Sequence, residues 1–191
     1  MDKRKILQIL LDQREELDSL VGNNFVERAE AAKFDFDSRL AQVVIGVRRS
    51  GKSTLCHQVL QKRNIGYGYV NFDDDRLATI TVDDLNDVLE ALYVIYGTEV
   101  EYLFFDEIQN VEGWHLFVNR LLRMGKHIFV TGSNARLLSS ELATHLTGRY
   151  NEIRLYPFSF KEYCCARNIS VELPTTKNLA VRQNALYDYL L

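Results

Sequence analysis

The chain has 191 residues, and 47% of them are hydrophobic, which is enough apolar material for one domain with a full core and a short appendage. Its formal net charge of −3 argues against a protein that is basic throughout and binds nucleic acid or membrane surfaces by bulk charge. The cysteines lack the spacing of a disulfide framework or a zinc site, and no apolar stretch approaches the length of a membrane span, so we expect a cytoplasmic protein.

The N-terminal part of the chain has the pattern of an amphipathic helix. Residues 3–20 place apolar side chains at helical spacing with charges between them. Residues 23–40 are more polar and predict a short helix followed by a connection into the first core strand. We therefore predict a helical lead-in over residues 1–38, before the core.

From residue 41 onward, apolar runs alternate with helical patterns. The runs predict buried strands at residues 41–45, 68–72, 101–105, 127–131 and 152–156. Helices are predicted between them at residues 52–63, 114–124 and 136–146. A further helix is predicted after a capping box of Thr81 and Asp84, and it ends at Gly97. Apolar strands separated by helices are typical of a parallel sheet covered on both faces. The sequence thus predicts an α/β fold, a three-layer domain with a five-stranded parallel sheet, over residues 39–163.

A glycine-rich segment follows the first predicted strand. Residues 46–53, GVRRSGKS, fit the pattern G-x-x-x-x-G-K-[ST], in which glycines allow a tight turn and consecutive N–H groups at a helix start attract phosphate. Lys52 would bring its charge to the β- and γ-phosphates, and the Ser53 hydroxyl is the expected Mg²⁺ ligand. The predicted nucleotide-binding residues are Gly46, Val47, Arg48, Arg49, Ser50, Gly51, Lys52, Ser53 and Thr54. Arg48 and Arg49 could instead be exposed loop charges without contact to phosphate, and Thr54 could instead serve helix packing.

The third predicted strand ends in two carboxylates, Asp106 and Glu107. In a parallel sheet they share an edge with the glycine-rich loop, so that Asp106 would hold Mg²⁺, directly or through water. Glu107 would orient and deprotonate an attacking water. A protein that only stores nucleotide has no need of this second carboxylate, which favours hydrolysis. The alternative is an acidic pair that caps the next helix.

Two further side chains are candidates for catalysis. Asn134, with Ser133 and Thr131 behind it, follows the fourth strand and would hydrogen-bond the γ-phosphate or the water, although a helix cap explains it equally well. Arg149 precedes the fifth strand and would stabilise transition-state charge, in cis or from a neighbouring subunit. A plain surface or salt-bridging arginine is the alternative.

The segments GVRRSGKSTL, FFDEIQNVEGWHLFVNRL, VTGSNARLLSSELATHLTGRY and LYPFSFKEY resemble the AAA+-related P-loop ATPases of the archaeal and bacterial "AAA domain" family. The resemblance covers residues 7–163 and implies a Walker A motif at 51–53 and a Walker B motif at 106–107. It also implies a sensor region at Asn134, a finger or sensor at Arg149, and a fourth strand between the first and the third. Adenine specificity follows from the resemblance. Because such relatives continue into a second domain, residues 164–191 are expected to begin a truncated C-terminal region.

The expected function is Mg²⁺-dependent ATP binding and hydrolysis that drives a conformational or assembly change. One alternative is a nucleotide-gated interaction module with little hydrolysis, which acts through a homo-oligomer or a protein partner bound by the missing C-terminal region. ATP-dependent DNA binding is the other, supported by a local basic cluster of Arg120, Arg123 and Lys126 that a charged helix face explains as well. Residues 25–28 are candidates for contact with the base.

Overall fold

The computed structural model describes residues 1–20, 25–133, 144–146, 148–170 and 175–190. The strands are β1 (Ala41–Gly46), β2 (Tyr67–Asn71), β3 (Tyr102–Asp106), β4 (His127–Ser133) and β5 (Tyr150–Leu155). The α-helices are α1 (Lys3–Leu20), α2 (Lys52–Lys62), α3 (Leu85–Tyr96), α4 (Trp114–Arg123), α6 (Phe160–Ala166) and α7 (Thr176–Leu190). Short 3₁₀ helices are η1 (Ala29–Lys33), η2 (Asp75–Leu77), η3 (Val82–Asp84) and η4 (Ile108–Asn110).

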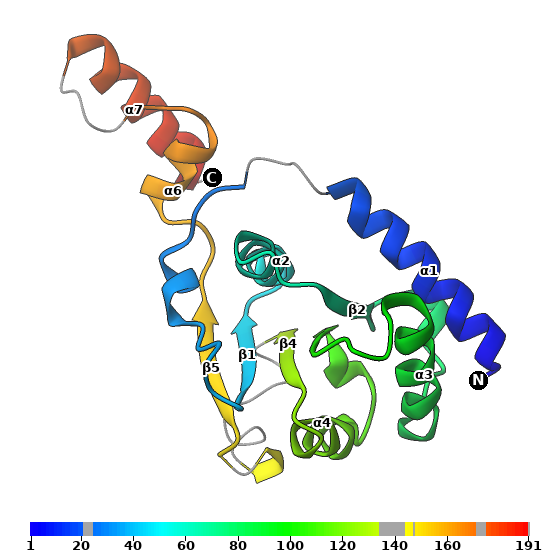
Figure 1. Ribbon diagram of the computed structural model, residues 1–191. Coiled ribbons are helices and arrows are strands. Elements are labelled where there is room, and N and C mark those ends of the chain that lie inside the picture. Colours follow the sequence, from blue (N-terminus) through cyan, green and yellow to red (C-terminus); the bar gives the residue numbers. More distant parts are fainter. Residues whose placement is uncertain (21–24, 134–143, 147, 171–174, 191) are drawn as a thin grey trace.

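The strands form one parallel sheet in the order β2-β3-β4-β1-β5. This arrangement confirms the predicted α/β fold with five parallel strands, and it confirms that the fourth strand lies between the first and the third. The carboxyl ends of β1, β4 and β3 are therefore neighbours along one edge of the sheet (Figure 1). Whatever follows these three strands is brought together there.

Helices cover the sheet on both faces and make three layers (Figure 1). On one face α3 and α4 pack against side chains such as Ile45 and Phe105, and on the other α2 packs against Val44 and Phe104. Because successive strand residues point to opposite faces, a strand buried on both sides must be apolar throughout, as the predicted runs are. Burial of one such side chain contributes about 1.5–3 kcal/mol.

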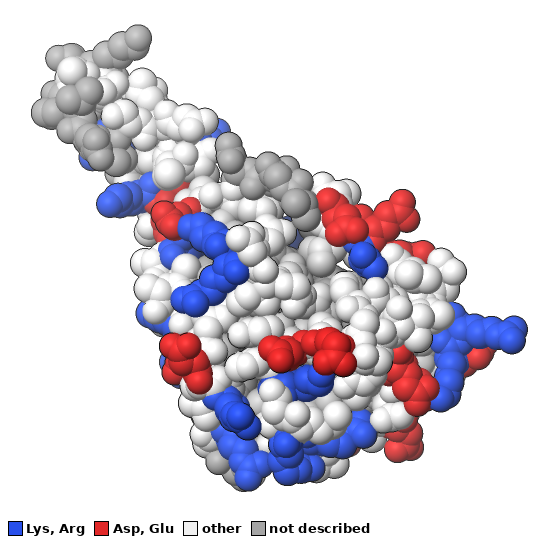
Figure 2. Space-filling model, in the orientation of Figure 1, with Lys and Arg blue, Asp and Glu red and all other residues white. Residues whose placement is uncertain are grey.

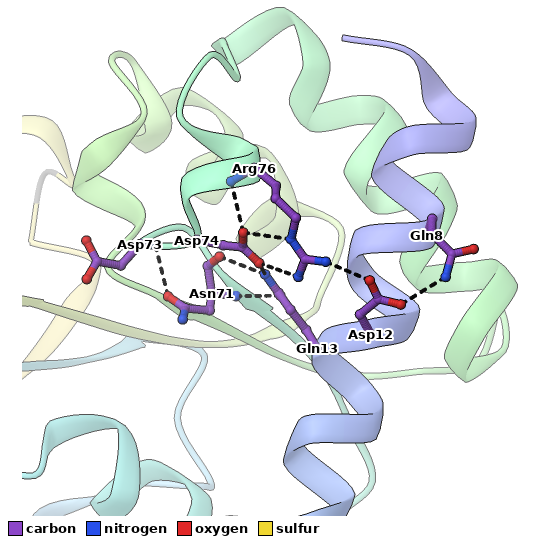
Figure 3. Close-up of polar contacts among 7 residues, drawn as sticks. All are labelled: Gln8, Asp12, Gln13, Asn71, Asp73, Asp74 and Arg76. Atoms are coloured by element: carbon purple, nitrogen blue, oxygen red, sulfur yellow. Dashed lines mark hydrogen bonds and ion pairs between the residues drawn. The ribbon is translucent and has the colours of Figure 1, made fainter.

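Helix α1 lies along β2, which is an edge strand of the sheet. Its first turns pack Ile6 and Leu10 into the cluster with α3, while Leu17 belongs to the cluster on the other face. Between them, the buried side chain of Gln13 pairs with the backbone of Asn71, donating to its carbonyl at 3.0 Å and accepting from its N–H at 2.9 Å (Figure 3). The Gln13 amide thus satisfies a strand edge that would otherwise stay unpaired.

Ion pairs also connect α1 to the segment that follows β2 (Figure 3). Arg76 contacts Asp12 of α1 at 2.6 Å and Asp74 at 2.8 Å, and Gln13 donates to Asp74 at 2.9 Å. Hydrogen bonds from Arg76 and Gln13 outweigh burial and lower the pKa of Asp74 to about 2. The N-terminal helix, grouped with the lead-in by its sequence, therefore contributes side chains to the core and covers the edge of the sheet.

The predicted strand bounds agree with the structure within two residues. The capping box of Thr81 and Asp84 is present, but it caps the 3₁₀ helix η3, and the α-helix that follows begins only at Leu85. The fifth strand begins at Tyr150 rather than at residue 152, because Tyr150 and Asn151 already pair with β1 although neither continues an apolar run. The helix predicted over 136–146 lies largely outside the described residues. Among the helices that the structure describes, none combines the length and apolar character needed to cross a membrane.

Candidate functional site

The loop of residues 46–53 connects β1 directly to α2. Arg49, with φ of 66°, and Gly51, with φ of 90°, both have left-handed backbone, and the helix begins at Lys52. The N–H groups of a first helical turn have no partner within the helix, and left-handed residues beside them curve the backbone into an anion-binding concavity. The local geometry therefore has the form that phosphate binding requires.

Gly46 is required for a reason that the motif alone does not give. A Cβ atom at this position would lie 2.2 Å from the carbonyl oxygen of Leu155 and 2.8 Å from the hydroxyl of Ser50. Backbone of β5 thus passes too close to β1 for any side chain. Phosphate approach, which the sequence pattern indicates for this glycine, stays a prediction, and the structure adds the close packing of two strands as a further requirement.

The lysine of the loop and the acidic pair after β3 meet at the carboxyl edge of the sheet. The Lys52 ammonium lies 3.3 Å from a Glu107 carboxylate oxygen and 3.4 Å from the carbonyl of Val47. The Ser53 hydroxyl donates to Asp106 at 2.9 Å. Both Lys52 and Asp106 are only 5% exposed. The structure thus brings together the loop and the two carboxylates, as the shared edge of a parallel sheet requires.

Three hydroxyl groups surround the buried carboxylate of Asp106. Thr131 and Ser53 donate to one oxygen, and Tyr69 donates to the other at 3.3 Å. Burial raises the pKa of Asp106 above its usual range, although the hydrogen bonds from Thr131 and Ser53 oppose the rise. A divalent cation beside this group would favour its charged form.

The donor set at this position suits Mg²⁺. A hydroxyl oxygen from Ser53 and a carboxylate oxygen from Asp106 are adjacent, and Mg²⁺ binds through one or two such protein ligands together with phosphate oxygens and waters. Within the described ranges, no group of three or more His, Cys, Asp or Glu side chains is placed to hold a metal by itself. The residues therefore fit an ion that is bound jointly with a phosphate.

Glu107 has unusual backbone for a residue other than glycine, with φ of 52° and ψ of 38°. Residues in this left-handed region occur at functional sites, where surrounding contacts hold them. Its N–H donates to the Thr131 hydroxyl at 3.1 Å, and its carboxylate accepts from Gln109. The side chain borders a cleft of about 200 Å³, also lined by Arg48, Asp73, Gln109, Asn110 and Ser133. Space for a small polar group or water thus lies beside this carboxylate.

Arg149 does not join this group of side chains. Asn134 lies outside the described residues, although Ser133 before it lines the cleft. Arg149 is exposed and precedes β5, and its carbonyl accepts from the N–H of Ala41 at the start of β1. The glycine-rich loop begins at Gly46, at the other end of β1. At about 3.3 Å per residue, that end lies about 17 Å from Ala41. Arg149 is therefore at the opposite edge of the sheet from the loop of its own chain.

The predicted basic cluster is only partly assembled. A hollow of about 460 Å³ beside α4 is lined by Arg120, Arg123 and Arg149, among others. Figure 2 shows Lys and Arg gathered where α4 lies. Lys126, in contrast, donates to the carbonyl of Val100 at 2.6 Å and lies over the ring of Tyr93. The hollow thus contains an arginine from just before β5 in place of the lysine.

Several neighbours of the carboxylates are absent from the sequence-based candidates. The Tyr69 hydroxyl contacts Asp106, and the Gln109 amide contacts Glu107. Across the cleft, the carboxylate of Asp73 lies 3.8 Å from the guanidinium of Arg48. The rule that parallel strand ends share an edge could have identified Asp73, since it follows the second strand. No local pattern marks Tyr69, because a buried tyrosine on a strand is indistinguishable from core.

Comparison with known proteins gives the family. A family model described as an AAA domain matches residues 38–164. The chain is 36% identical over 177 residues to an uncharacterized protein of Methanocaldococcus jannaschii, a match that covers 88% of this chain and 40% of that protein. It is 43% identical over 142 residues to an uncharacterized protein of Haemophilus influenzae, a match that covers 70% of this chain and 35% of that protein. With its parallel sheet and its G-x-x-x-x-G-K-[ST] loop, the chain belongs to the AAA-domain family of P-loop ATPases.

Proposed function

We propose that this protein binds ATP together with Mg²⁺ at the loop of residues 46–54 and hydrolyses it, which drives a conformational or assembly change. The observation that carries the proposal is the meeting of Lys52 and Ser53 with Asp106 and Glu107 at one edge of the sheet. Membership of the AAA-domain family supports nucleotide binding independently of this geometry.

The chain's own groups have separate tasks in binding. N–H groups at the start of α2 would donate to phosphate oxygens, and Lys52 would place its charge between the β- and γ-phosphates. Its present partner is Glu107, at 3.3 Å. When Lys52 turns to a phosphate, the carboxylate of Glu107 loses its ion pair and becomes free to accept a proton from water.

Ser53 and Asp106 would hold the metal, and their separation by one hydrogen bond supports this assignment. Mg²⁺, when bound, supplies positive charge that neutralises the phosphate oxygens. Thr131 and Tyr69 keep the carboxylate of Asp106 oriented through their hydroxyl groups. The metal-binding side chain is thus held in place by its neighbours.

Glu107 is proposed as the general base. Its carboxylate borders the cleft, lies beside Lys52 of the loop, and also accepts a hydrogen bond from Gln109 of η4. Asn134 and Ser133 remain candidates for orienting the water, from the end of β4. Arg149 remains the candidate for transition-state charge, and its position at the opposite edge favours action from a neighbouring subunit.

Two substitutions test this assignment. We expect Lys52→Ala to weaken ATP binding about ten- to hundredfold, because a charge-assisted contact to phosphate is lost. We expect Glu107→Gln to bind ATP as the wild type does and to lose turnover about 10²- to 10⁴-fold, because only the base is removed. Calorimetric titration with ATP and Mg²⁺ gives affinity, and phosphate release gives turnover.

Glu112→Gln is the matched control, because it makes the same change at an exposed position close by. It should leave both affinity and turnover unchanged. Wild-type turnover in Glu107→Gln would refute the base, and wild-type affinity in Lys52→Ala would refute the binding site.

A nucleotide-gated module with little hydrolysis in the isolated chain is the second candidate. The position of Arg149 favours it, because a chain alone lacks this side chain at its own loop. Under this alternative ATP binds with the same affinity, and turnover becomes measurable only when chains associate or a partner is added.

A further inference from the structure

Arg28 is a buried charge that is outside the proposed catalytic group. It lies between α1 and η1, is 6% exposed, and contacts three separate segments. Its guanidinium donates to the carbonyl of Tyr156 after β5 at 2.7 Å and to the carbonyl of Ser50 at 3.3 Å. It also lies 2.8 Å from a carboxylate oxygen of Glu162 on α6. One rigid, planar group thus joins the phosphate loop to the segment that follows the sheet.

The contact with Ser50 acts on the peptide that precedes α2. In a trans peptide the carbonyl and the following N–H point in opposite directions, so the Gly51 N–H points away from Arg28. Arg49 and Gly51, both left-handed, flank this peptide. By holding the Ser50 carbonyl, Arg28 fixes the orientation of the Gly51 N–H and polarises it as a donor.

The contact with Glu162 acts on the first turn of α6. One oxygen of Glu162 meets Arg28, and the other accepts from the Ser159 N–H at 2.8 Å and from the Ser159 hydroxyl at 2.7 Å. Burial raises the pKa of Glu162, but hydrogen bonds from Ser159 and the charge of Arg28 outweigh it and lower the pKa below its usual range. The same carboxylate therefore caps α6 and anchors it to Arg28.

Further contacts extend this anchor. The guanidinium lies 4.9 Å from the ring of Phe158, and the Tyr189 hydroxyl of α7 donates to the Phe158 carbonyl at 2.7 Å. Figure 1 shows α6 and α7 extending away from the sheet beyond the carboxyl end of β5. Their attachment to the core thus includes the contacts of one arginine that also holds the phosphate loop.

We propose that Arg28 is a positioning residue that couples phosphate binding at the loop to the docking of α6 on the core. The inference rests on the proposed function, in which the loop binds nucleotide phosphates. Phosphate held by the Gly51 N–H stabilises the peptide orientation that Arg28 recognises, and Arg28 in that position retains Glu162. Because coupling between two sites is reciprocal, loss of the Glu162 contact must weaken ATP binding by the same factor.

Two variants and one structural probe test the coupling in the full 191-residue chain. Glu162→Gln removes the charge that pairs with Arg28 but keeps a residue suited to the capping box. We expect it to bind ATP with Mg²⁺ about fivefold more weakly than the wild type. Arg28→Gln should weaken binding about tenfold or more. Hydrogen exchange of residues 160–166 should slow about fivefold on ATP addition in the wild type and stay unchanged in both variants.

Lys62→Gln is the matched control. It removes the ion pair between Lys62 and Glu27, the residue next to Arg28, without touching the loop or α6. It should bind ATP as the wild type does and should retain the exchange response of α6. This control separates loss of the Arg28 contacts from a general loosening of the segment.

The outcomes separate this inference from the function it rests on. Wild-type affinity in Glu162→Gln, or an α6 that does not respond to ATP in a wild type that binds it, overturns the coupling and leaves the ATP site intact. No ATP binding by the wild type overturns both. If Arg28→Gln does not fold, as circular dichroism would show, Glu162→Gln and the wild-type exchange response still decide.

Discussion

At the scale of single residues, His57 is a buried histidine that is neutral at physiological pH. It lies on α2, shares a hydrogen bond of 2.8 Å with the Tyr67 hydroxyl, and packs 4.9 Å from the rings of both Tyr69 and Phe104. Burial lowers the pKa of His57 to about 4. Its surroundings explain this shift without any catalytic role, since a charged imidazole would lose its hydration there.

This shift predicts a specific loss of stability in acid. Below a pH of about 6.5 the unfolded chain binds a proton at this histidine while the folded protein does not, so stability falls as the pH decreases toward about 4. Between pH 7 and pH 5 the contribution amounts to about 2 kcal/mol. Urea unfolding at both pH values should show that His57→Gln lacks this loss. Equal pH dependence in the two proteins would contradict the assignment.

At the scale of elements, the junction of α1 with β2 depends on one amide. Gln13 is 2% exposed and satisfies both backbone groups of Asn71. We expect Gln13→Ala to reduce the free energy of unfolding by about 1–3 kcal/mol, because the edge of β2 is left with unpaired polar groups. Chemical denaturation measures the change.

Gln8→Ala is the control on the same helix. Its amide donates to Asp12 at 2.9 Å, in an exposed position (Figure 3). Such a surface change should alter the free energy of unfolding by less than about 0.5 kcal/mol. If both variants lose the same amount, α1 is held by its apolar face alone and the strand-edge pairing contributes nothing.

At the scale of the whole molecule, one chain presents the proposed ATP site and Arg149 at opposite edges of its sheet. If chains associate with these edges in contact, Arg149 of one reaches the loop of the next. We therefore expect Arg149→Ala and Lys52→Ala each to lose turnover, by about 10³-fold or more for the arginine. A mixture of the two should recover turnover, because the intact loop of one variant then meets the intact arginine of the other.

Turnover per chain should also rise with protein concentration in the wild type. Arg154→Ala, which removes an exposed arginine of β5, should leave turnover unchanged. Wild-type turnover in Arg149→Ala would exclude the arginine from the reaction. A mixture as inactive as its components would show that no active site is shared between chains.

Local patterns were sufficient for most of the elements and for the central part of the site. Strands β1 to β4 have apolar residues at odd and at even positions, because side chains on both faces of the sheet are buried. The sequence alone predicts that the phosphate loop and the acidic pair lie close together, because the carboxyl ends of parallel strands share one edge of the sheet. The start of β5 was missed by two residues because an edge strand tolerates polar side chains such as Asn151.

Contacts between distant segments could not be inferred in this way. Arg28 meets residues 22, 128 and 134 positions further along the chain, and nothing in its neighbourhood marks it as buried. The role of Thr131 was underestimated, because only the structure reveals that its hydroxyl joins Asp106 to the backbone of Glu107. The close approach of Leu155 to Gly46 likewise depends on tertiary packing, and the motif does not reveal it.

The amino-acid order alone thus sufficed for the parallel sheet, the phosphate loop and the pair of carboxylates beside it, because each depends on short-range spacing and on strand direction. Tertiary packing decided which groups hold these residues in place, and it placed Arg149 at the far edge. The reason is physical: burial and hydrogen bonding of a side chain depend on every segment that approaches it, and those approaches are set by the packed core rather than by neighbours in the chain.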